Sequence, residues 1–152
     1  MGFETHRRLS RADGVTLCNA VVGFTAGAVA FADLGLAARL LLLSVIVDAL
    51  DGIVARSGDS SDVGPLLDSI TDVVSFGVTP SLFVYVGLAA RFGGVSAGPL
   101  TVAAIALVAS LYAVFSVIRT AFYTTYFDGA EERPGMPNSL GAILLATTYL
   151  AG

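Results

Sequence analysis

The chain has 152 residues, of which 55% are hydrophobic and 13% are charged, and its formal net charge is −4. This charged fraction is about half that of an ordinary soluble domain, and the high hydrophobicity also excludes a disordered chain. There is no lysine among the eight basic residues, so the composition excludes a nucleic-acid-binding protein. The length predicts a single domain, residues 1–152.

Apolar segments follow one another along the chain, several long enough to cross the roughly 30 Å apolar core of a bilayer. The polar residues 1–14 precede them and form either a short interfacial helix or a disordered tail. The last segment, about sixteen residues at 1.5 Å each, is too short to cross, so we expect the fifth helix to be incomplete. The predicted fold is an all-α, polytopic membrane helix bundle with about five spans: residues 15–32, 34–56, 64–90, 99–123 and 137–152.

The distribution of arginines predicts the orientation of these spans. Cytoplasmic ends of membrane helices carry an excess of basic residues. With the N-terminus inside, the arginines divide six to two in favour of the cytoplasm, which also places the turn after residue 56 there. The six are Arg7, Arg8, Arg11, Arg56, Arg119 and Arg133, whereas Arg39 and Arg91 fall outside.

Charge is concentrated around the predicted turn between the second and third spans. Seven of the twenty charged residues lie between Asp48 and Asp72. On helices, Asp48 and Asp51 share one face, and Asp68 and Asp72 share another. Because the intervening turn is short, the two helices are predicted to be adjacent and antiparallel, which brings four carboxylates together.

Four clustered carboxylates in a low-dielectric site repel one another and require a counter-charge. Hard oxygen ligands favour Mg²⁺, Mn²⁺ or Ca²⁺, and four carboxylates suffice for two ions. Two-metal sites commonly support in-line attack on phosphorus. Gly52 and Ala55 leave a bare strip where a ligand can approach the backbone, and Arg56 is suited to a bidentate phosphate contact.

This segment resembles the signature of the CDP-alcohol phosphotransferase family, D-x-x-D-G-x-x-A-R followed by a spacer and G-x-x-x-D-x-x-x-D. The spacer here has seven residues, where the family commonly has eight. The missing residue falls in the turn, so we expect the aspartates to keep their places on the two helices. All eight defining residues are present: Asp48, Asp51, Gly52, Ala55, Arg56, Gly64, Asp68 and Asp72.

The resemblance implies a membrane enzyme, usually of six helices, that displaces CMP from a CDP-linked substrate with an alcohol nucleophile. It implies that all four aspartates bind two Mg²⁺ or Mn²⁺ ions and that Asp72 is the general base. It also implies a homodimer in the cell membrane of a prokaryote, and the arginine distribution places the N-terminus and this active site on the cytoplasmic side. The implied nucleotide-binding residues are Asp51, Gly52, Ala55, Arg56, Gly64 and Asp68.

Later residues resemble the serine-using branch of the family, the phosphatidylserine and archaetidylserine synthases. These are the stretch from Phe76 to Ser81 (FGVTPS), the turn 135–139 (GMPNS) and Arg119. Arg119 is suited to hold the carboxylate of serine or a lipid phosphate, and anchoring at the membrane interface explains it equally well. Asn19 is placed to reach the nucleotide or to make an interhelical hydrogen bond.

The sequence therefore predicts a phospholipid-synthesising transferase whose partners are a CDP-lipid, L-serine and membrane lipids. The lipid is CDP-archaeol or CDP-diacylglycerol. An alternative keeps this chemistry with glycerol phosphate or inositol phosphate as the acceptor, although these acceptors would need more basic residues. An alternative from another class is a cation transporter, which would need carboxylates spread across the membrane depth.

Overall fold

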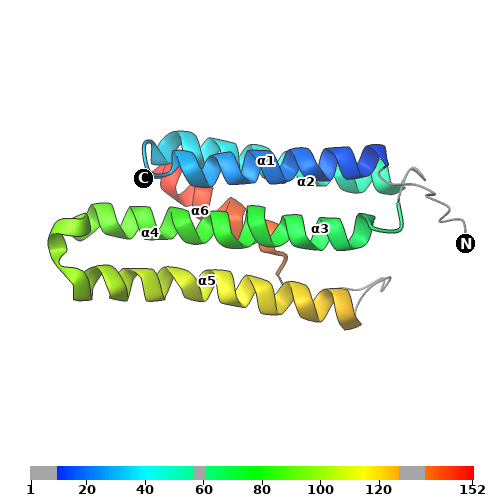
Figure 1. Cartoon of the computed structure of the whole chain (residues 1–152). Helices are drawn as coiled ribbons and strands as arrows, with labels where there is room; N and C mark the ends of the chain where they lie inside the picture. Colours follow the sequence, from blue (N-terminus) through cyan, green and yellow to red (C-terminus); the bar gives the residue numbers. More distant parts are fainter. Residues whose placement is uncertain (1–9, 57–60, 127–135) are drawn as a thin grey trace, which may run out of the picture.

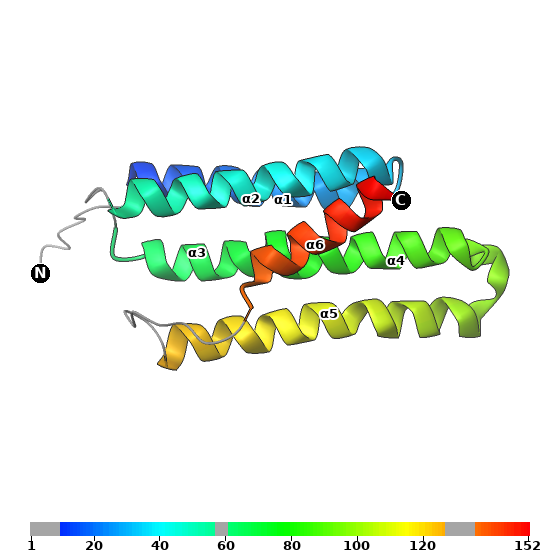
Figure 2. The ribbon, with the colours of Figure 1, turned by 180° about the vertical axis from the view of Figure 1, so that it is seen from behind.

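The computed structural model describes residues 10–56, 61–126 and 136–152 as a bundle of helices, with no strand among these residues. The prediction of an all-helical membrane bundle is confirmed. Helices α1 and α2 pair at one side, α3 and α4 lie in the middle, and α5 lies beyond them (Figure 1). Helix α6 crosses this arrangement diagonally (Figure 2). The bounds are α1 Arg11–Val29, α2 Leu34–Arg56, α3 Gly64–Val73, α4 Thr79–Arg91, α5 Pro99–Tyr126 and α6 Asn138–Ala151.

The start of α1 lies four residues before the predicted span. Ser10 and Asp13 form a capping box, in which the Asp13 amide donates to Ser10 Oγ over 3.1 Å and the Ser10 amide donates to Asp13 Oδ2 over 2.6 Å. These bonds satisfy backbone donors that the first turn leaves without helical partners. Residues 11–14 therefore belong to the membrane helix, and the rest of the predicted N-terminal segment, residues 1–9, lies outside the described residues.

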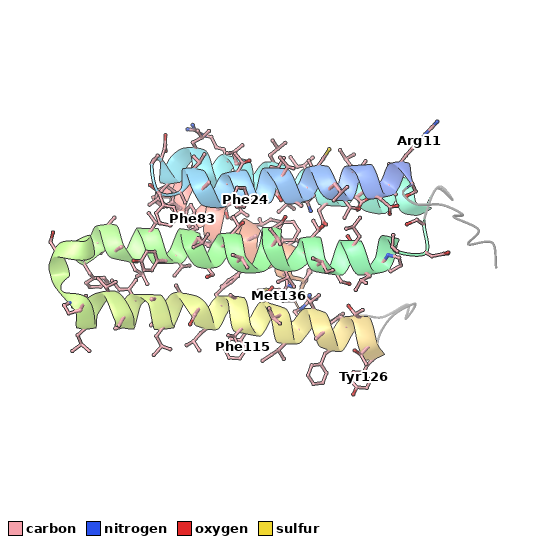
Figure 3. All side chains as sticks on the ribbon, in the orientation of Figure 1. Arg11, Phe24, Phe83, Phe115, Tyr126 and Met136 are labelled. Atoms are coloured by element: carbon pink, nitrogen blue, oxygen red, sulfur yellow. The ribbon has the colours of Figure 1, made fainter. Side chains whose placement is uncertain are left out.

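Three helices are long and apolar enough to cross a membrane by length and composition: Arg11–Val29, Gly64–Arg91 and Pro99–Tyr126. Helix α2 is similar in length and carries Arg39, Asp48, Asp51 and Arg56. Large apolar side chains cover the outer face of α5, where Phe115 and Tyr126 point away from the bundle (Figure 3). These two side chains are 67% and 70% exposed, the arrangement expected of a helix that faces lipid.

The helix Gly64–Arg91 contains a π-helical segment that the sequence analysis did not predict, η1 at Val74–Val78. The Thr79 amide donates to the Val74 carbonyl, five residues earlier. The segment ends just before Pro80, which has no N–H to donate to the Phe76 carbonyl. Single π turns of this kind are frequent at functional sites.

Small residues let the middle helix approach its neighbours closely. A Cβ added at Gly23 of α1 would lie 2.8 Å from Ser75 Cα, and one added at Gly77 would lie 2.7 Å from Ser116 Oγ of α5. Thr79 also donates to the Gly23 carbonyl over 2.8 Å. The π segment is thus packed directly against both α1 and α5, which fixes the helix that carries Asp68 and Asp72.

The turn between α4 and α5 is glycine-rich. It contains the 3-10 helix η2, Gly94–Ala97. Gly93, Gly94 and Gly98 have φ values of 90°, 56° and 87°. These are left-handed conformations that side chains disfavour, so glycine is required for the reversal.

Candidate active site

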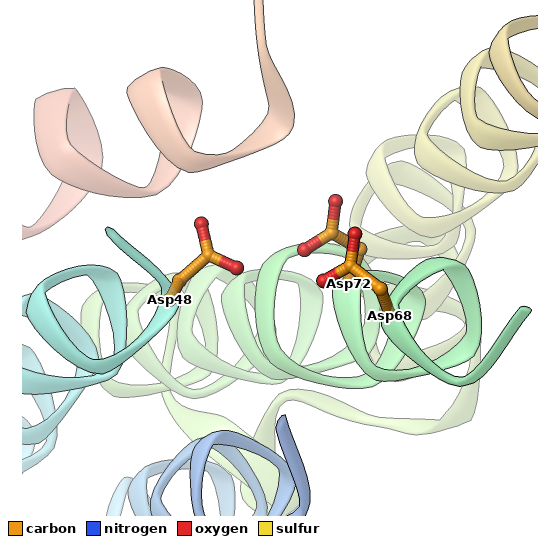
Figure 4. A group of neighbouring side chains, drawn as sticks. All are labelled: Asp48, Asp68 and Asp72. Carbon is orange, nitrogen blue, oxygen red and sulfur yellow. The ribbon is translucent and has the colours of Figure 1, made fainter. Parts of the chain in front are cut away.

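Three aspartates from two helices converge at one end of the bundle. Asp48 of α2 faces Asp68 and Asp72 of α3 (Figure 4). One carboxylate oxygen from each lies within 4.8 Å of the others. The two helices, α2 and α3, run antiparallel and are joined by the short turn predicted from the sequence. We name Asp48, Asp68 and Asp72 the carboxylate cluster.

Asp51 lies one turn from Asp48 but outside this cluster. It is 6% exposed, and its Oδ2 accepts a hydrogen bond from the Thr16 hydroxyl of α1. The structure therefore brings three of the four predicted metal ligands together, and α1 binds the fourth. Thr16 itself was missed in the sequence analysis, although it is a polar residue within an apolar span.

Two carboxylate oxygens, one in the cluster and one on Asp51, are buried with no hydrogen-bond partner among the described residues. They are Oδ1 of Asp51 and Oδ1 of Asp72. A buried carboxylate oxygen without a donor is costly unless a cation is bound nearby. These oxygens, together with the carboxylate cluster, form a donor set that fits a hard divalent cation.

Asn19 connects α1 to both helices that carry the cluster. It is 1% exposed, and its Nδ2 donates to Asp48 Oδ1 over 3.4 Å. Its side-chain oxygen accepts a bond from Ser44 of α2, and its backbone carbonyl accepts one from Ser75 over 3.2 Å. The sequence analysis left two roles for Asn19, a nucleotide contact or an interhelical hydrogen bond. The structure shows interhelical hydrogen bonds.

Gly64 lies at the first turn of α3, close to the start of α1. A Cβ at this position would lie 3.1 Å from Asp13 Oδ1, so the glycine permits close approach of the two helices. Asp13 is 1% exposed, and its burial was missed because it stands in a polar stretch of the sequence. The turn before Gly64 is described from Ser61 onward.

The remaining predicted nucleotide residues occupy the last turns of α2. Gly52 is half-buried, one residue beyond Asp51. Ala55 and Arg56 lie within the helix, and their side chains fall outside the described part of the structure. Their predicted contacts with the nucleotide remain predictions.

Arg119 lies on α5 beside the cluster. It is half-buried and interacts electrostatically with Asp72. Its Cζ is 4.1 Å from the centroid of the Tyr123 ring, one turn further along. The charge of the predicted acceptor-binding residue thus acts on the predicted general base.

Residues 9–151 match the family described as CDP-alcohol phosphatidyltransferase, and the chain belongs to this family. The match covers the predicted motif and confirms the family resemblance. No solved structure matches the chain.

Curated relatives come from the serine branch. The chain is 31% identical over 123 residues to archaetidylserine synthase of Methanothermobacter thermautotrophicus, covering 78% of this chain and 48% of the relative. It is 43% identical over 84 residues to CDP-diacylglycerol--serine O-phosphatidyltransferase of Methanocaldococcus jannaschii, covering 55% of this chain and 39% of the relative. For the protein of that name in Helicobacter pylori J99, identity is 32%, over 76% of this chain and 46% of the relative. The chain thus spans about half or less of the length of these relatives.

Proposed function

We propose that the full-length protein transfers a phosphatidyl-type group, based on diacylglycerol or archaeol, from a CDP-lipid to the hydroxyl of L-serine and releases CMP. The observation that carries this proposal is the convergence of three carboxylates within 4.8 Å, at the family motif of a chain built of apolar helices. The names of the curated relatives support serine as the acceptor.

The proposed metal ligands are Asp48, Asp51, Asp68 and Asp72, which would hold two Mg²⁺ or Mn²⁺ ions. When bound, the ions neutralise the diphosphate and stabilise CMP as the leaving group. The orphaned oxygens of Asp51 and Asp72 support this assignment. Because Asp51 is bonded to Thr16 in the structure, we assign it to the side of the site nearest α1.

In the proposed reaction, Asp72 takes the proton from the serine hydroxyl. The serine oxygen forms a bond to the lipid-bearing phosphorus, while the bond from that phosphorus to the CMP oxygen breaks and its electron pair leaves with CMP. Arg119 binds the serine carboxylate beside Asp72. The proposed nucleotide contacts are Asp51, Gly52, Ala55, Arg56, Gly64 and Asp68.

We place this single-domain protein in the cell membrane of a prokaryote, with its N-terminus and active site cytoplasmic, as a homodimer. Three helices of sufficient length and hydropathy support the membrane setting. The orientation rests on the arginine asymmetry. Site-directed labelling of residues in the turn 91–98 from outside intact cells would test it.

The central experiment supplies labelled serine, glycerol phosphate and inositol phosphate side by side to membranes that contain the full-length protein. CDP-archaeol and CDP-diacylglycerol serve as lipid donors. We expect label from serine in lipid, dependent on Mn²⁺ or Mg²⁺ and lost with a chelator. If glycerol phosphate or inositol phosphate is incorporated and serine is not, the assignment of serine as the acceptor is wrong. If none of the three acceptors is incorporated, the proposed function is wrong.

A cation transporter is the contrasting hypothesis. A transport pathway would place carboxylates at several depths, whereas these three gather at one level of the bundle. Binding of a cytidine nucleotide separates the two hypotheses, because a cation transporter has no reason to bind one.

A further inference from the structure

The Arg119 and Tyr123 side chains form a pair on successive turns of α5. The guanidinium carbon lies 4.1 Å from the centroid of the ring, within the range of a cation–π contact. Both side chains are half-buried, which strengthens such a contact relative to one at an exposed surface. The pair is therefore a defined structural unit and differs from a solvated arginine at a helix end.

The same two turns of α5 are bonded to neighbouring helices. Asn138 Nδ2 of α6 donates to Thr120 Oγ1 over 3.0 Å, and Ser69 of α3 is bonded to Thr124 through their hydroxyls at 2.9 Å. These bonds fix the backbone beneath the pair relative to the helix that carries Asp72. The Arg119 side chain is long and has several rotatable bonds. Its contact with the Tyr123 ring restricts the conformations that it can adopt.

An aromatic partner orients a guanidinium without neutralising it. A carboxylate in the same place would compensate the positive charge and occupy the N–H groups. A ring stacked on a guanidinium leaves the edge of the group, where the N–H donors lie, to bind a planar anion in bidentate fashion. Arg119 also interacts electrostatically with Asp72, the predicted base.

We propose that Tyr123 is a positioning residue that holds Arg119 as the subsite for the carboxylate of the acceptor amino acid. This inference rests on the proposed function and adds the residue that determines the geometry of acceptor binding. A carboxylate bound by Arg119 presents the hydroxyl of the same molecule to Asp72.

The test compares three variants of the full-length protein in membranes. Tyr123→Leu removes the ring, Tyr123→Phe keeps the ring without the hydroxyl, and Tyr126→Leu is the matched control. Tyr126 is on the same helix, is 70% exposed and packs on Phe122 at a centroid distance of 5.7 Å. The KM values for serine and for CDP-lipid are measured separately, together with kcat.

Tyr123→Leu is expected to raise the KM for serine roughly threefold to thirtyfold, the equivalent of one cation–π contact, with the KM for CDP-lipid unchanged. Tyr123→Phe recovers most of this loss, and Tyr126→Leu behaves as the unmodified protein. Three results would overturn this inference and leave the proposed function standing. The KM for serine is unchanged in Tyr123→Leu, the KM for CDP-lipid rises instead, or Tyr123→Phe raises the KM for serine as much as Tyr123→Leu does. Absence of serine transfer by the unmodified protein overturns the proposed function, and the inference with it.

Discussion

Asn19 is hydrogen-bonded to Asp48 across two helices, with the amide nitrogen donating to Oδ1 over 3.4 Å. The amide is itself held by Ser44, one turn before Asp48 on α2. Asn19 and Ser44 are almost completely buried, and Asp48 is half-buried. The carboxylate that α2 contributes to the cluster is therefore oriented by a residue of α1.

Replacing Asn19 by leucine keeps a similar volume and removes the donor to Asp48. We expect the Mn²⁺ concentration required for half-maximal activity to rise about 10- to 100-fold, the usual effect of losing a residue that orients a metal ligand. Thr25→Val is the control, because Thr25 is exposed on α1 and bonds only within its own helix, to the Val21 carbonyl at 2.7 Å. A normal Mn²⁺ titration in Asn19→Leu would contradict the assignment.

The Asp72→Asn variant separates proton transfer from nucleotide binding. Turnover is expected to fall about 10²- to 10⁴-fold, because the amide cannot accept the proton of the attacking hydroxyl. Binding of CDP, measured by equilibrium dialysis of the detergent-solubilised protein, is expected to persist. Asp62→Asn, an exposed residue of the turn, should leave both measurements unchanged. If Asp72→Asn loses CDP binding as well as turnover, Asp72 is needed for nucleotide binding and its assignment as the general base is not supported.

Thr16→Val removes the hydroxyl that donates to Asp51 Oδ2, with little change in shape. We expect the KM for CDP-lipid to rise several-fold while the KM for serine stays constant, since Asp51 is assigned to the nucleotide side. Thr25→Val again serves as the control on the same helix. Equal changes in both KM values would show that Thr16 supports the whole bundle and not this part of the site.

Gly23→Ala tests the close packing of α1 against the π segment. The added methyl would lie 2.8 Å from Ser75 Cα, so the helices must separate, at a cost of about 1–3 kcal/mol in the free energy of unfolding. Gly87→Ala is the matched control, because nothing lies within 4 Å of a Cβ there and alanine favours the helix by about 1 kcal/mol. Unfolding in detergent, followed by circular dichroism, measures both. Equal stability of the two variants would contradict this packing.

The helices themselves were predictable from the sequence, since long uncharged segments have few other stable structures in a bilayer. The predicted segment 34–56 coincides with α2, and 64–90 differs by one residue from the helix Gly64–Arg91. The approach of Asp48 to Asp68 and Asp72 also followed from spacing, because two short-linked helices must run antiparallel.

The contacts between helices could not be predicted in the same way. Periodicity indicates which residues share a face, but not how far a neighbouring helix slides or rotates. Asp51 shares a helix with Asp48 and is nevertheless bonded to Thr16, because α1 packs against α2 at this position. The burial of Asp13 depends equally on the position of Gly64 in another helix.

The π segment Val74–Val78 affects how residue numbers relate to faces of the helix. A π turn accommodates one residue more than an α turn, so a helical wheel drawn through Gly64–Arg91 misplaces every residue beyond Val78 by about 100°. Removing one residue inside the segment would restore an α turn and leave the faces on both sides where they are. Chain length can therefore change by one at this position, whereas the same deletion in α3 after Asp72 would rotate Asp68 and Asp72 by about 100° relative to α4.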